Sequence, residues 1–157
     1  MVDLRRFSFG GPAGIVTSMA LIVGCISAAS PKATLVGSLL IVAVADNLTD
    51  SLSMHIYQEA ERLSARQAFG TTIANFVTRV IISASFIALI VSLSEDAAIY
   101  ASIVWGFVLL GVLSSLLAQR CGTKPLAEVL KHCGVAVVVI AISWQIGLWI
   151  PLLLAGR

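Results

Sequence analysis

The stretch 133–154, CGVAVVVIAISWQIGLWIPLLL, decides the class of fold, because no residue in it is charged. A helix needs roughly 20 consecutive apolar residues to cross a bilayer, and this stretch is long enough. Of the 157 residues in the whole chain, 59% are hydrophobic and 11% are charged, whereas soluble domains carry about 25% charged residues. The mean hydropathy is +1.01. Such a chain has too few polar residues to cover a surface in water, so its predicted surroundings are a lipid bilayer.

Four further apolar stretches precede this one. They run from about 12 to 29, 33 to 57, 71 to 93 and 97 to 118. The sequence therefore predicts an all-α, polytopic membrane protein with five transmembrane helices in a single domain, residues 1–157. A signal peptide is an alternative for the first stretch, but no small-residue cleavage site followed by a soluble domain is visible. The segment Pro125 to His132 predicts a short interfacial helix leading into the last span, with proline in its first turn.

Basic residues predict the orientation of these helices. With five spans, the N-terminus and the connections 2–3 and 4–5 share one side of the membrane, which then holds most of the ten Lys and Arg residues. They are Arg5, Arg6, Arg62, Arg66, Arg120, Lys124 and Lys131. The other side holds Lys32 and Arg157, together with the acids Glu95 and Asp96. The positive-inside rule thus predicts an N-terminus inside and a C-terminus outside.

Several function classes lack support in the sequence. The net charge is +2 and no basic run exceeds Arg5-Arg6, so no nucleic-acid partner is predicted. No Ser-His-Asp set, phosphate loop or HExxH motif is present, so neither an enzyme nor a bound cofactor is predicted. Cys25, Cys121 and Cys133 have no metal-binding spacing and are interpreted as small apolar fillers.

The second apolar stretch differs from the others, because its continuation is polar: residues 39–61 read LLIVAVADNLTDSLSMHIYQEAE. At the helical repeat of 3.6 residues, several of its side chains fall within an arc of about 100°. They are Asp46, Asp50, Ser53, Met54, Tyr57 and Glu61. Asp46 lies roughly 20 Å along the helix axis, which is inside the bilayer. Ionisable groups at that depth are costly and usually mark an ion or substrate pathway.

Two carboxylates one turn apart, with a methionine one turn further, suit a divalent cation. Carboxylate oxygens bind hard ions such as manganese, whereas the Met54 sulfur favours softer ions such as ferrous iron. Like charges this close oppose each other's ionisation. An entering cation would therefore displace protons, which is the physical basis of proton–metal exchange.

The same stripe has a purely structural interpretation. It could be a polar seam between two helices in a membrane subunit that assembles but transports nothing. Arg79, within the third apolar stretch, could neutralise Asp46 or Asp50, since a buried charge is satisfied by an opposite one. Asn75 and Thr78, close to Arg79 in sequence, could line the same polar region.

Residues 39–61, preceded by Gly14-Ile-Val-Thr-Ser-Met-Ala-Leu-Ile-Val-Gly24, resemble the vacuolar iron transporter (VIT) family. Ala45-Asp46 and Ser53-Met54 reproduce the spacing of that family's second helix, and residues 128–147 are similar to its last span. The resemblance implies a proton-coupled homodimer that exports ferrous iron or manganese from the cytosol. The metal would pass between the first two helices of both subunits. Asp46 takes the family's acidic position, Met54 its methionine, and Gln58 the position of a glutamate.

The chain departs from the family pattern in three respects. Ala13 stands where the family has an acid before the first helix's Gly-Ile-Val run. The cytosolic metal-binding domain between the second and third helices is missing. Asp50 and Arg79 have no counterpart among the family positions, and Asp50 could compensate for Ala13. The short connections suggest a bacterial inner membrane as the location.

Overall fold

The structure, a computed structural model, describes residues 10–61 and 65–155, and this part is almost entirely helical. The elements are α1 (Gly10–Ser27), α2 (Lys32–Ile41), the π-helical turn η2 (Val42–Asp46), α3 (Asn47–Ala60), α4 (Ala65–Ser92), α5 (Glu95–Cys121) and α6 (Pro125–Ala155). Because α2, η2 and α3 follow one another without a break, they form one span. Five helices in the described part are therefore long and apolar enough to cross a membrane. The predicted all-α fold with five spans is confirmed.

Three helices extend beyond their predicted bounds. The expected interfacial helix and the last span form one continuous helix, α6, because nothing between Pro125 and Cys133 breaks it. The polar segment 58–70 was expected to be a connection, yet α3 continues to Ala60 and α4 already begins at Ala65. These polar turns are helical because α3 and α4 pack against each other there. Gly122, in the left-handed conformation at φ 68°, ends α5.

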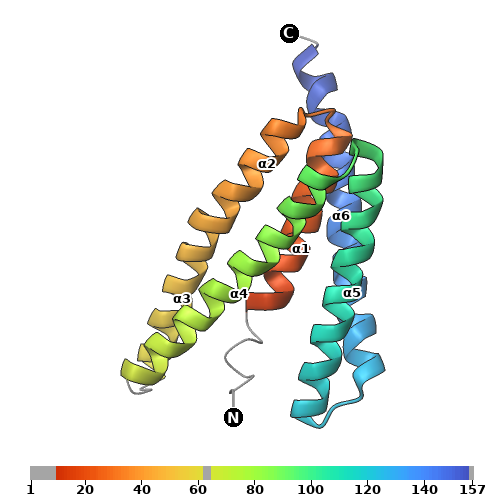
Figure 1. Cartoon of the computed structure of the whole chain (residues 1–157). Helices are drawn as coiled ribbons and strands as arrows, with labels where there is room; N and C mark the ends of the chain where they lie inside the picture. The colour runs from red at the N-terminus through yellow and green to blue at the C-terminus, as the bar shows by residue number, and fades with distance from the viewer. Residues whose placement is uncertain (1–9, 62–64, 156–157) are drawn as a thin grey trace.

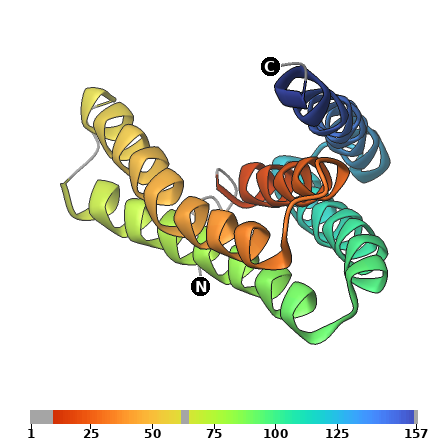
Figure 2. The same ribbon diagram turned by 90° about the horizontal axis from the view of Figure 1, so that it is seen from above.

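The helices alternate in direction along the bundle (Figure 1). Seen from above, α1 lies between two groups, the α2–α3 and α4 pair on one side and α5 with α6 on the other (Figure 2). Within its most apolar window, 44% of α1 is buried, whereas only 6% of the corresponding window of α6 is buried. α1 is thus the central helix, and most of α6 faces outward.

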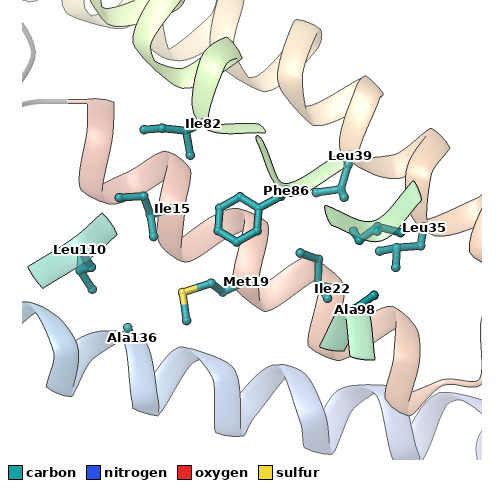
Figure 3. Packing of buried hydrophobic residues seen from close by; sticks show 11 residues of the cluster. Ile15, Met19, Ile22, Leu35, Leu39, Ile82, Phe86, Ala98, Leu110 and Ala136 are labelled. Carbon is teal, nitrogen blue, oxygen red and sulfur yellow. The ribbon is translucent and has the colours of Figure 1, made fainter. Parts of the chain in front are cut away.

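The core is built on one side chain per turn of α1. Ile15, Met19 and Ile22 are at most 1% exposed. They pack against Phe86 of α4 and Leu110 of α5, with residues of α2 and α6 completing the cluster (Figure 3). Cys25 and Cys133 pack at its edge, as expected for apolar fillers, whereas Cys121 is exposed.

Glycines let the outer helices approach α1. A Cβ atom on Gly147 of α6 would collide with the Ser27 hydroxyl and with the backbone oxygen of Gly24. A Cβ atom on Gly106 of α5 would collide with the side chain of Met19. Close backbone contact at small residues is how membrane helices associate, since lipid provides little hydrophobic drive between them.

The two ends of the bundle differ in charge. Arg66, Arg120, Lys124 and Lys131 lie at the end where α1 begins, and Lys32 lies at the opposite end (Figure 1). Arg5, Arg6, Arg62 and Arg157 are outside the described residues. The described cations thus follow the predicted distribution, and the orientation in a membrane stays a prediction.

Candidate functional site: an arginine between two aspartates

A π-helical turn, Val42–Asp46, interrupts the second span just before its polar part. Such a turn weakens the regular hydrogen bonding of a helix, and π turns are frequent at functional sites. Side chains from the next turn contact its carbonyl groups. Asn47 Nδ2 donates to Ala43 O at 2.8 Å, and Thr49 Oγ1 donates to Asp46 O at 2.9 Å. These bonds supply polar partners where lipid offers none.

Arg79 of α4 is the centre of the polar cluster, with only 3% of its side chain exposed. Its Nη2 lies 2.7 Å from Asp46 Oδ2, and its Nη1 lies 2.7 Å from Asp50 Oδ2. Its Nε donates to Asn47 Oδ1 at 2.6 Å. All three guanidinium nitrogens are therefore engaged by residues at the junction of η2 and α3, and Arg79 contacts both aspartates rather than one.

Asn75, one turn before Arg79 on α4, extends this network. Its Nδ2 lies 3.1 Å from Asp50 Oδ2 and 3.3 Å from Ser51 Oγ. Its Oδ1 is buried and has no hydrogen-bond partner in the described residues. A Cβ atom on Gly10 would collide with this oxygen, so a larger residue at this position of α1 would force the Asn75 side chain to move. Asp50 is thus held by two α4 side chains and Asp46 by one.

The two aspartates remain accessible on the side away from Arg79. The Asp46 side chain is 48% exposed and the Asp50 side chain is 42% exposed. In each carboxylate, Oδ2 forms the ion pair with Arg79, whereas Oδ1 makes no hydrogen bond within residues 10–61 and 65–155. Two hard oxygen ligands are therefore free on the surface of a membrane-spanning helix.

The other predicted site residues on and just after α3 divide between two faces of the helix. Ser53, Tyr57 and Glu61 are exposed, and Met54 is half-buried. Gln58, in contrast, is 6% exposed and faces α4, so the structure does not bring it to the outward side of the aspartates. Thr78 donates to Ala74 O within α4. The structure thus brings Asp46 and Asp50 together and leaves the predicted residues nearer Glu61 outside the arginine cluster.

Sequence reasoning missed the two side chains that join the cluster from the inner face of α3. Asn47 and Ser51 are 1% and 3% exposed. They are four residues apart, and Gln58 lies seven further on, so they follow one side of the helix. The spacing of Asn47, Ser51 and Gln58 is visible in the sequence. However, Asp46 and Asp50, which directly precede Asn47 and Ser51, favour a different side of the helix as the polar one.

A second polar contact lies further along the same pair of helices. Thr72 Oγ1 of α4 lies 3.3 Å from His55 Nδ1, and His55 Nε2 lies 3.4 Å from Glu59 Oε1. Among the described residues, no three His, Cys, Asp or Glu side chains gather closely enough to hold a metal ion.

Comparisons with models of known protein families, with characterised proteins and with solved structures find no match to this chain.

Proposed function

We propose that this protein transports a divalent transition-metal cation, ferrous iron or manganese, out of the cytosol in exchange for protons. One observation carries the proposal: the Asp46 and Asp50 side chains are 48% and 42% exposed, and each has one carboxylate oxygen that makes no hydrogen bond to the described residues. Both lie partway along a helix that is long and apolar enough to cross a membrane. A structural ion pair has no need for free oxygens on its outer side. Ionisable groups at this depth are usually part of an ion or substrate pathway.

The chemistry of the outward side suits such a cargo. Carboxylate oxygens bind divalent ions, and the Met54 thioether, one turn beyond Asp50, favours iron over magnesium. Arg79 keeps positive charge beside the two acids while no cargo is bound, and an arriving cation competes with it for Asp46 and Asp50. The arginine therefore weakens cargo binding, which helps a transporter to release its cargo.

The proposal includes a second copy of the chain. The outward side of the second span is apolar around the aspartates, with Leu40, Val44, Leu48 and Leu52 all more than half exposed. A partner placed there would cover Asp46 and Asp50 and could supply the ligands that one chain lacks. The short connections favour a bacterial inner membrane for this dimer, and the basic residues favour an N-terminus on the inside.

Metal flux in proteoliposomes tests the proposal. With Mn²⁺ outside and a fluorescent metal indicator inside, Asp46→Asn and Met54→Ala are expected to reduce the initial rate roughly tenfold or more. Even the loss of a residue that supports a metal ligand costs about 10–100-fold in affinity or activity. Asp96→Asn is the matched control, because Asp96 is an exposed acid in the first turn of α5. If both variants transport Mn²⁺ as fast as the control, Asp46 and Met54 are not the site.

The contacts of Arg79 favour a second candidate, a non-transporting membrane subunit in which the polar stripe is an assembly seam. All three guanidinium nitrogens are bound to the second span, at the junction of η2 and α3, as a purely structural lock requires. In that case liposomes show no flux, and Asp46→Arg lowers the amount of assembled protein. Exchanging the charges, Asp46→Arg with Arg79→Asp, should then restore assembly. Failure of this restoration, together with measurable flux in the unchanged protein, excludes the seam.

A further inference from the structure

An open groove lies on the opposite side of α1 from the aspartates, between α1, α5 and α6. Its volume is about 450 Å³. Most of its lining is apolar and includes Val16, Ala20, Leu110, Val135 and Val139. The apolar part follows α6 for roughly 10 Å from His132 to Val139, a length that suits part of an acyl chain.

One end of the groove is polar. His132, in the second turn of α6, lines the groove there, and its Nδ1 lies 2.8 Å from Ser114 Oγ. Ser114 is fully buried, so this contact holds the imidazole ring in place. The other ring nitrogen, Nε2, makes no hydrogen bond to the described part of the chain. It is therefore available to a ligand lying in the groove.

The connection at this end of the bundle is basic. Arg120 and Lys124 are exposed and form no ion pair with any described residue. Lys131 lies 2.9 Å from Glu128 Oε1, so that pair carries no net charge. Two positive charges thus remain on the α5–α6 connection, at the same end of the bundle as His132. Basic sites between membrane helices are typical binding sites for anionic lipid headgroups.

We propose that this groove binds one anionic phospholipid. An acyl chain lies along Val16, Val135 and Val139, and the phosphate is placed near His132 Nε2, within the field of Arg120 and Lys124. The inference does not depend on metal transport. It requires only that α1, α5 and α6 lie in a bilayer and that the basic connection is at the level of the headgroups.

Native mass spectrometry of the full chain, released from mixed phosphatidylglycerol and phosphatidylcholine vesicles, tests the site. One tightly retained phosphatidylglycerol is expected, with the neutral lipid retained far less. Arg120→Gln with Lys124→Gln should lower this preference by about fivefold for each charge removed. Arg66→Gln, at the same end of the bundle but on α4, is the control for surface charge and should have no effect.

A groove-filling substitution tests the position of the lipid. Val135→Trp should abolish the retained phosphatidylglycerol, whereas Val138→Trp should leave it bound, since both valines are similarly exposed, at 55% and 57%, and only Val135 lines the groove. The proposal is overturned if both lipids are retained equally, or if the two tryptophan variants behave alike. It is also overturned if Val135→Trp changes the number of chains in the complex, because the groove would then hold protein. The two charge variants lie on the surface and report on the site even if a tryptophan variant does not fold.

Discussion

Arg79→Leu is expected to lower the free energy of unfolding by about 3 kcal/mol, the lower end of the range for breaking a buried ion pair. The lower end applies because Asp46 and Asp50 are 48% and 42% exposed and keep part of their solvation. The substitution removes the only cation that contacts these acids in the described residues, and it leaves Asn47 Oδ1 without its donor. Reversible unfolding in mixed detergent micelles measures the change.

Three further variants separate charge from packing. Lys131→Leu removes an exposed pair with Glu128 and should cost less than about 0.5 kcal/mol. Adding Asp46→Asn and Asp50→Asn to Arg79→Leu should recover part of the lost stability, since no unpaired charge then remains. Arg79→Lys should be intermediate, because an ammonium group cannot reproduce the fork that contacts three partners. If Arg79→Leu is as stable as Lys131→Leu, the cluster does not hold α3 to α4.

Gly147→Ala is expected to destabilise the protein by about 2–3 kcal/mol, the cost of overpacking a close contact. The added methyl group would collide with the backbone oxygen of Gly24, and a backbone atom cannot move aside as a flexible side chain can. α1 and α6 would have to separate, so the effect should reach the whole bundle. The same unfolding measurement in micelles reports it.

The same helix contains the matched control. A Cβ atom on Gly134 meets no atom within 4 Å, so Gly134→Ala changes helix propensity alone. This control should stabilise the protein by about 0.5–1 kcal/mol, because glycine inside a helix is unfavourable. Equal stability of the two variants would show that α1 and α6 do not approach closely at Gly147.

The sequence by itself determined that this is a membrane protein of five helices. Transfer of a segment into lipid depends on its own length and polarity, so residues 133–154 could be recognised without their neighbours. The same local argument singled out Asp46, Asp50 and Arg79, because charges are rare within spans. Helix ends were less predictable where polar turns pair with each other, as in the region between Gln58 and Gly70.

Only the tertiary structure decided which side of each helix faces which neighbour. A π-helical turn such as Val42–Asp46 shifts the phase of the following helix by about 100° relative to regular α geometry. Asn47, Ser51 and Gln58 therefore face α4, and the two aspartates lie at the edge of this contact, with one oxygen inside and one outside. α1 covers the cluster at Gly10, where a Cβ atom would collide with the Asn75 side chain and lie 3.0 Å from Arg79 Cδ. Contacts of this kind join residues more than 30 positions apart, and no local pattern in the chain encodes their distance.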